Sequence, residues 1–114
     1  MALSQQDKRR FPRIRCATPL RYQVRGSGEF NNVLTDDISS SGVGFINDRF
    51  IAPATPIMLE INLLSNVLTP IGKVAWSEPL LHSYRYRLGI EFIEFNQRER
   101  DYLGDYIDMR MGKL

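Results

Sequence analysis

The chain is poor in the residues that most enzyme centres need. Its 114 residues include one cysteine, Cys16, and one histidine, His82. A single cysteine cannot form an intramolecular disulfide, and a single histidine excludes a histidine metal cluster or a histidine pair. No Gly-x-Ser-x-Gly elbow, phosphate-binding loop or dinucleotide fingerprint is present. We therefore expect no catalytic residue, no metal and no cofactor, and we interpret the chain as a binding module rather than an enzyme.

Long apolar runs are also missing. No stretch approaches the roughly 20 apolar residues of a membrane helix, and the N-terminus has no apolar segment typical of a signal peptide. With the lone cysteine, these absences predict a cytoplasmic protein that does not insert into membranes. The 43% hydrophobic and 25% charged content is ordinary for a globular protein, and the length suits one domain. Without an excess apolar face, a monomer is the expected state.

Positive charge gathers near the N-terminus, although the formal net charge is only +2. Residues 1–25 contain one acid against seven basic residues, and the rest of the chain has more acids than bases. The seven are Lys8, Arg9, Arg10, Arg13, Arg15, Arg21 and Arg25. Pro12 favours extended backbone, so residues 8–13 are predicted to form an extended arm. Its guanidinium groups suit phosphate oxygens or the O6/N7 edge of guanine, and a solvated basic tail is the alternative.

Period-two alternation of apolar and polar residues predicts strands over most of the remaining chain. The predicted strands cover residues 18–24, 30–38, 43–46, 57–63, 67–77 and 84–92. Pro70 and Gly72 lie inside the fifth of them and indicate an edge position or a bulge. The connections are too short for parallel crossovers, so the strands are predicted to form an antiparallel barrel or sandwich.

A helix is predicted over about residues 96–112. Asn96 is a favourable N-cap, and Leu103 and Ile107 are one helical turn apart. The fold class is therefore all-β with a C-terminal helix. We expect a flexible N-terminal arm of residues 1–17, followed by residues 18–114 as the strands and the helix, in a single domain overall.

The turn from Asp37 to Gly42 supplies chemistry that complements the arm. Its sequence Asp-Ile-Ser-Ser-Ser-Gly is typical of a tight turn, because Asp and Ser side chains bond to nearby backbone groups. The Asp37 carboxylate could accept from guanine N1–H and N2, Ser39 could add a small donor, and Gly42 would let a flat base approach. A structural turn without a ligand is the alternative. Together, arm and turn predict a site that surrounds a guanine nucleotide.

The two motifs, in this order and with a strand between them, resemble the PilZ domain family of cyclic di-GMP receptors. Arg9-Arg10-Phe11-Pro12-Arg13 matches the family's Arg-x-x-x-Arg, and Asp37-Ile38-Ser39-Ser40-Ser41-Gly42 matches Asp/Asn-x-Ser-x-x-Gly. Residues 88–92, Leu-Gly-Ile-Glu-Phe before a helix, are also family-like. The resemblance covers nearly the whole chain and implies a six-stranded antiparallel barrel with a C-terminal helix.

The resemblance also implies a set of ligand-binding residues. Arg9 and Arg13 would hold phosphates and guanine, and Asp37, Ser39 and Gly42 would surround a guanine. Lys8 precedes the first motif arginine, which in the family accompanies two intercalated ligand molecules. The full candidate set is Lys8, Arg9, Arg10, Arg13, Asp37, Ser39, Gly42 and Trp76. For Trp76, a position near the ligand and a position in the core are equally open.

These residues predict a cyclic di-GMP receptor and adaptor. The arm would fold over the bound nucleotide and present a new surface to an unidentified downstream protein. The alternative is a nucleic-acid-binding barrel that uses the arm on phosphates, although the acidic remainder of the chain disfavours it and no DNA partner is expected. The process controlled, whether motility, adhesion or polysaccharide synthesis, is open.

Overall fold

The computed structural model describes residues 11–113. The elements are β1 (Ile14–Arg15), β2 (Pro19–Val24), β3 (Asn31–Ser39), β4 (Gly42–Asn47), β5 (Pro56–Leu63), β6 (Asn66–Leu68), β7 (Ile71–Pro79), β8 (Tyr86–Glu94) and α2 (Gln97–Arg110). The predictions for Lys8, Arg9 and Arg10, and the first ten residues of the predicted flexible arm, lie outside the described residues.

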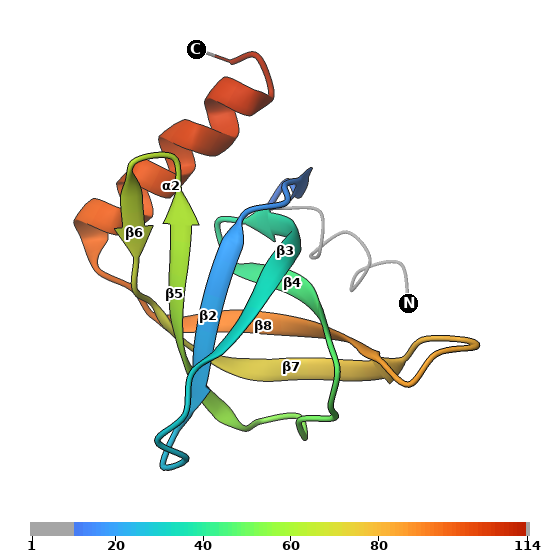
Figure 1. The fold of residues 1–114 in the computed structure, drawn as a ribbon. Helices are drawn as coiled ribbons and strands as arrows, with labels where there is room; N and C mark the ends of the chain where they lie inside the picture. Colours follow the sequence, from blue (N-terminus) through green and yellow to red (C-terminus); the bar gives the residue numbers. More distant parts are fainter. Residues whose placement is uncertain (1–10, 114) are drawn as a thin grey trace, which may run out of the picture.

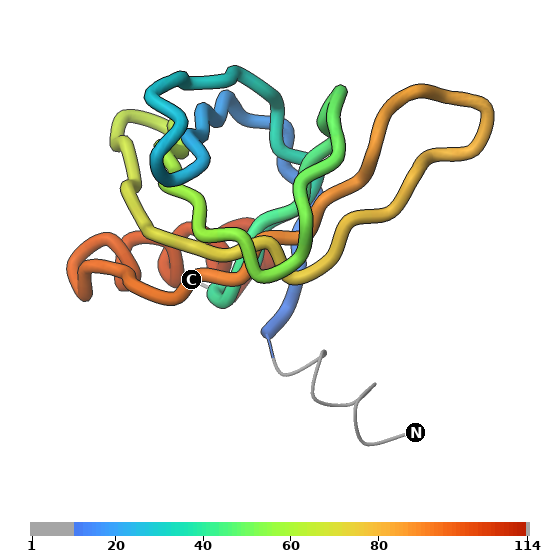
Figure 2. Tube along the Cα trace, turned by 90° about the horizontal axis from the view of Figure 1, so that it is seen from below, coloured from blue at the N-terminus to red at the C-terminus, as the bar shows by residue number. Residues whose placement is uncertain are grey.

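Six of the strands form a closed antiparallel barrel. Their order around the ring is β3, β2, β5, β7, β8 and β4, and the pairing of β4 with β3 closes it. Figure 1 shows the barrel from the side, and Figure 2 looks along it and shows the chain encircling the centre. The predicted six-stranded barrel with one C-terminal helix is confirmed.

Two short strands extend the barrel sheet. β6 pairs with β5, and β1 pairs with β3, in register Ile14 with Ile38 and Arg15 with Asp37. The prediction of one long strand over residues 67–77 is wrong, because β6 ends at Leu68 and β7 begins at Ile71. Pro70 interrupts the strand, since proline has no N–H to donate to a ladder. Its carbonyl oxygen still accepts a hydrogen bond from the Leu59 amide at 3.1 Å.

The barrel interior is a continuous apolar core. Alternate residues of β2 and β5 are buried, as the period-two pattern predicts. The largest fully buried side chains include Leu20, Tyr22, Ile38, Phe45, Ile57, Leu59, Ile61, Leu63 and Leu88. The rings of Tyr22 and Phe45 stack with 5.4 Å between their centroids. The Tyr22 hydroxyl donates to Asn47 Oδ1 at 2.8 Å, which satisfies both buried polar groups.

Helix α2 packs against the core through Leu103 and Ile107, which are almost completely buried. It begins where Asn96 Oδ1 accepts hydrogen bonds from the amides of Arg98 and Glu99, as the predicted N-cap requires. Figure 1 shows it crossing the end of the barrel at which β1 and β6 lie. Within the described part of the chain, no helix is long and apolar enough to cross a membrane.

Candidate functional site

The Asp37 carboxylate lies on the outer face of the barrel beside the first residues that the structure describes. Arg13 Nη1 donates to Asp37 Oδ1 at 2.9 Å. β1 holds the two together, because its backbone pairs Arg15 with Asp37 and starts one residue after Arg13. Both side chains are partly exposed, at 45% for Arg13 and 25% for Asp37. The structure thus joins one residue of each predicted motif in a single ion pair.

A β-bulge in β3 gives the neighbouring Asp36 a different environment. The register with β4 shifts between Thr35 and Asp37, which leaves Asp36 as the extra residue. Arg87 of β8 donates to Asp36 Oδ2, and Arg15 Nη2 lies 3.5 Å from Asp36 Oδ1. Adjacent carboxylates are therefore held by different arginines: Asp36 by Arg15 and Arg87, and Asp37 by Arg13 on the outer face.

Two glycines separate Asp37 from Trp76 across the sheet. Asp37 of β3 is opposite Gly44 of β4, Gly44 is opposite Gly89 of β8, and Gly89 is opposite Trp76 of β7. A Cβ atom on Gly44 would lie 2.7 Å from Asp37 Oδ1, and one on Gly89 would lie 2.3 Å from the Trp76 ring. The carboxylate and the indole therefore rest on glycine backbone. We call residues Asp37, Gly44, Gly89 and Trp76 the glycine-floored row.

Trp76 is partly exposed rather than buried. Its exposed fraction is 38%, and it is absent from the buried core cluster. One face of the indole covers Gly89, since the three nearest atoms to a Cβ there all belong to the ring. The core position that the sequence left open for Trp76 is therefore wrong. An indole that is exposed beside a flat glycine surface is suited to stacking with a planar ring.

The turn between β3 and β4 is organised by Ser39. This residue is 1% exposed, and its hydroxyl accepts a hydrogen bond from the Ser41 amide at 3.2 Å. Gly42 has a negative φ, and glycine is needed there because a Cβ atom would lie 2.2 Å from the Ile90 carbonyl oxygen. In this structure Ser39 and Gly42 hold the turn against β8, whereas Asp37 and Arg13 lie on the outer face.

Pattern reasoning missed four residues of this region: Asp36, Gly44, Arg87 and Gly89. The glycines carried a signal, since glycine inside a strand often marks a place where another group approaches closely. Asp36 is adjacent to the motif residue Asp37, and the sequence alone does not show the bulge that gives Asp36 its separate contacts. Arg87 is distant in sequence, and only the β4–β8 register brings it near Asp36.

The structure resembles solved proteins of one kind. The similarity to the Bacillus subtilis inhibitor of motility (MotI/DgrA) has a TM-score of 0.79 and 18% identity, covering 92% of this chain and 52% of that chain. The similarity to Escherichia coli YcgR in complex with c-di-GMP has a TM-score of 0.75 and 16% identity, and it covers 93% of this chain and 47% of that chain. The similarity to the PilZ domain of Escherichia coli YcgR with c-di-GMP has a TM-score of 0.62 and 14% identity, and it covers 94% of this chain and 99% of that chain.

These likenesses are likenesses of fold, because each identity is below 20%. The chain spans about half the length of the first two structures. No curated protein sequence matches the chain. The family model described as PilZ domain matches residues 7–109, which is most of the sequence and includes both arginine and aspartate motifs. The chain therefore belongs to the PilZ domain family.

Proposed function

We propose that this domain is a receptor for cyclic di-GMP, with one guanine lying along the glycine-floored row. The observation that carries the proposal is the placement of Asp37 and Trp76 at the two ends of a floor without side chains. A guanine presents N1–H and N2 donors that a carboxylate accepts, and a planar face that an indole can stack on. The two YcgR structures, both solved with c-di-GMP, support the choice of ligand.

Arg13 changes partner when the ligand binds. In the free protein it occupies Asp37 Oδ1, which is the acceptor that guanine needs. Ligand binding exchanges this contact for two: guanine donates to Asp37, and the guanidinium turns to a phosphate or to guanine O6/N7. Because the Arg13–Asp37 pair is partly exposed to solvent, breaking it costs little, about 1 kcal/mol.

The basic arm supplies the remaining phosphate contacts in this proposal. Lys8, Arg9 and Arg10 precede Arg13 in the sequence, and the first motif arginine is Arg9. Ordering six residues costs roughly 6–12 kcal/mol of backbone entropy, so several charge-assisted hydrogen bonds must form together. Two intercalated nucleotides would offer enough phosphate oxygens for this. The folded arm would then present a new surface to a downstream protein, and the domain would act as an adaptor.

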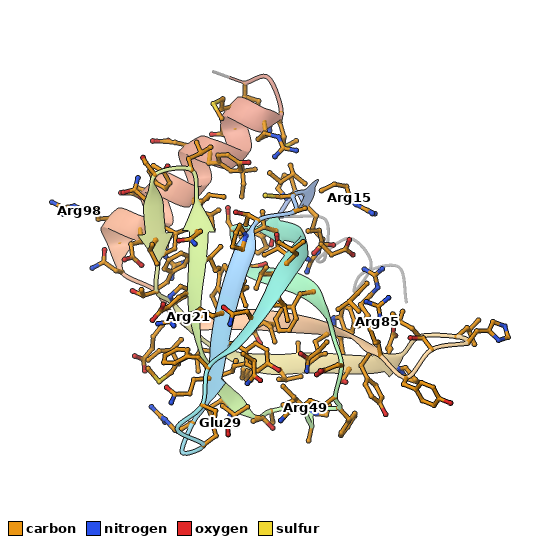
Figure 3. All side chains as sticks on the ribbon, in the orientation of Figure 1. Arg15, Arg21, Glu29, Arg49, Arg85 and Arg98 are labelled. Atoms are coloured by element: carbon orange, nitrogen blue, oxygen red, sulfur yellow. The ribbon has the colours of Figure 1, made fainter. Side chains whose placement is uncertain are left out.

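Calorimetric titration with cyclic di-GMP tests the receptor. We expect saturable binding with two nucleotides per chain, and loss of binding in the Arg9→Ala and Asp37→Ala variants. Arg98→Ala is the matched control, because this exposed arginine begins α2 away from β1, as Figure 3 shows. The fluorescence of Trp76, the only tryptophan, should change on binding. A folded wild-type protein that gives no binding heat would refute the receptor.

The competing function is binding of single-stranded nucleic acid. A basic segment in the same chain as an exposed tryptophan is also typical of such proteins, which stack bases and follow phosphates. It predicts tighter binding of long oligonucleotides than of the dinucleotide, and a steep loss of affinity with salt. A competition titration between cyclic di-GMP and an oligonucleotide of guanine and thymine separates the two functions.

A further inference from the structure

Helix α2 is bonded through its last turn to β1, the strand that directly follows the arginine motif. Arg110 Nη2 donates to the Arg15 carbonyl oxygen at 2.7 Å. Arg110 Nη1 donates to the Tyr106 hydroxyl at 2.8 Å. The Tyr106 hydroxyl in turn lies 3.7 Å from the sulfur of buried Cys16. One guanidinium therefore connects the C-terminal end of the chain to β1, near its N-terminal end.

β1 is too short to be held by strand pairing alone. It has two residues, and it pairs only with β3 among the described strands. One further backbone hydrogen bond, from the Cys16 amide to the Asp36 carbonyl oxygen at 3.1 Å, joins the residue after β1 to β3. Arg110 supplies a bond to β1 from α2. In Figure 3 the Arg15 side chain points away from the helix, toward the side on which the β7–β8 hairpin projects.

We propose that Arg110 is a positioning residue for the nucleotide site. It anchors the backbone of β1, and β1 fixes the position of Arg13, which directly precedes it, and thereby the point at which the arm joins the barrel. This role rests on the proposed cyclic di-GMP function. Without the anchor, residues 14 and 15 sample more conformations, so Arg13 must be ordered when the ligand binds rather than beforehand. Arg110 contacts no residue of the glycine-floored row in the structure and acts through β1.

The geometry of the anchor explains why an arginine is needed. A guanidinium presents several N–H donors in a fixed plane and can serve the carbonyl and the hydroxyl at once. Tyr106, one helical turn before Arg110, orients that plane while its own hydroxyl contacts Cys16. A lysine ammonium also carries several donors, but without the fixed plane of a guanidinium it would hold β1 less well.

Titration of Arg110→Gln and Tyr106→Phe variants with cyclic di-GMP tests the proposal. We expect Arg110→Gln to bind about three- to tenfold more weakly, the size usual for a residue coupled to a remote site. Tyr106→Phe should give a smaller loss in the same direction. Arg98→Gln, in the first turn of the same helix, should bind as the wild type does. Circular dichroism and thermal unfolding confirm that every variant is folded.

Two readouts separate positioning from a general loss of stability. In a double-mutant cycle, the effect of Arg110→Gln should shrink in an Arg13→Ala background, because both act through the arm, and should stay additive with Trp76→Ala. In the free protein, hydrogen exchange at the Cys16 amide should accelerate in Arg110→Gln while exchange in β7 and β8 stays unchanged.

The outcomes distinguish this proposal from the receptor function beneath it. A wild-type protein that does not bind cyclic di-GMP would overturn the receptor, and this role of Arg110 with it. Binding by the wild type with unchanged affinity in Arg110→Gln would overturn the role of Arg110 alone. Weaker binding that is additive with Arg13→Ala would also overturn it, because the anchor would then not act through β1.

Discussion

At the residue scale, chemically similar side chains have different roles because their surroundings differ. Asp36 and Asp37 are adjacent, yet Asp36 is paired with two arginines and Asp37 with Arg13 on the outer face. The β-bulge causes this difference, since it inserts a residue into the strand and redirects its neighbours. The proposed base contact therefore falls to Asp37, and Asp36 keeps the bulge in place.

Tyr22 predicts how stability depends on pH. Burial raises the pKa of Tyr22, and the hydrogen bond to Asn47 offsets part of this rise. An unfolded tyrosine titrates near pH 10, so above about pH 10 the unfolded chain loses this proton more readily than the folded one. The free energy of unfolding should therefore fall as the pH rises from about 10 through the folded pKa. Urea unfolding between about pH 8 and 11 measures this.

Tyr22→Phe is the control for that prediction. It removes the titrating group, so stability should fall less steeply with rising pH than in the wild type. It also leaves Asn47 Oδ1 without its buried donor, which should cost about 1–3 kcal/mol at neutral pH. Equal slopes for the two proteins in alkaline solution would contradict the assignment to Tyr22.

At the element scale, register decides the site. Strands β3, β4, β8 and β7 are consecutive in the ring, so one lateral row can carry a residue from each. A slip of one residue in any pair would move the carboxylate or the indole to the other face. Glycine at the two inner positions lets the Asp37 carboxylate and the Trp76 indole lie directly over the backbone, because a Cβ atom there would overlap them.

Gly89→Ala should displace Trp76 and weaken cyclic di-GMP binding. The new methyl group would overlap the indole, which must swing away from the floor. Loss of a stacked base typically costs about 1–3 kcal/mol, so affinity should fall by roughly fivefold or more. A shift of tryptophan fluorescence in the free protein reports the displacement. Gly26→Ala, in a distant turn with positive φ, should lower stability without changing affinity.

Gly104→Ala should stabilise the protein. Gly104 lies inside α2, and a Cβ atom there would meet nothing within 4 Å. Because alanine loses less backbone entropy in a helix, the free energy of unfolding should rise by about 0.5–1 kcal/mol. Chemical denaturation measures the change, and cyclic di-GMP affinity should stay the same. A decrease in stability would mean that the helix contacts its surroundings at this position.

At the scale of the whole molecule, a closed barrel carries the candidate site, and β1 and the last turn of α2 meet beside it. Closure leaves the six barrel strands with neighbours on both sides and provides a stable outer face. The N-terminal segment joins the barrel sheet through β1, which pairs with β3, and α2 bonds to β1 from the other end of the sequence. The uneven charge of the sequence puts three cationic residues, Lys8, Arg9 and Arg10, before Arg13, and the proposed function uses them for phosphate contacts.

Ionic strength should distinguish a dinucleotide ligand from a polymer. Cyclic di-GMP carries two phosphates, so few counterions are released when it binds. We expect its affinity to fall less than about tenfold between roughly 50 and 200 mM salt. A polymer contacted at six or more phosphates would lose about a thousandfold or more over the same range. Titrations at several salt concentrations measure the slope, and a steep slope with cyclic di-GMP would contradict the proposed contacts.

The sequence by itself determined the architecture of this protein. Alternation at Leu20, Tyr22 and Val24 and in the later segments predicted the strands, because a half-buried strand needs one apolar face. The capping residue Asn96 marked the start of α2, and short connections required antiparallel pairing. The arginine and aspartate motifs marked the two segments that meet at Arg13 and Asp37.

Only the tertiary structure decided how the candidate site is put together. Asp37, Gly44, Gly89 and Trp76 lie in one row because of the register across four strands, which no local pattern specifies. The bulge at Asp36 and the bond from Arg110 to β1 are equally non-local. Local propensity depends on neighbours in the chain, whereas these contacts depend on closure of the whole barrel.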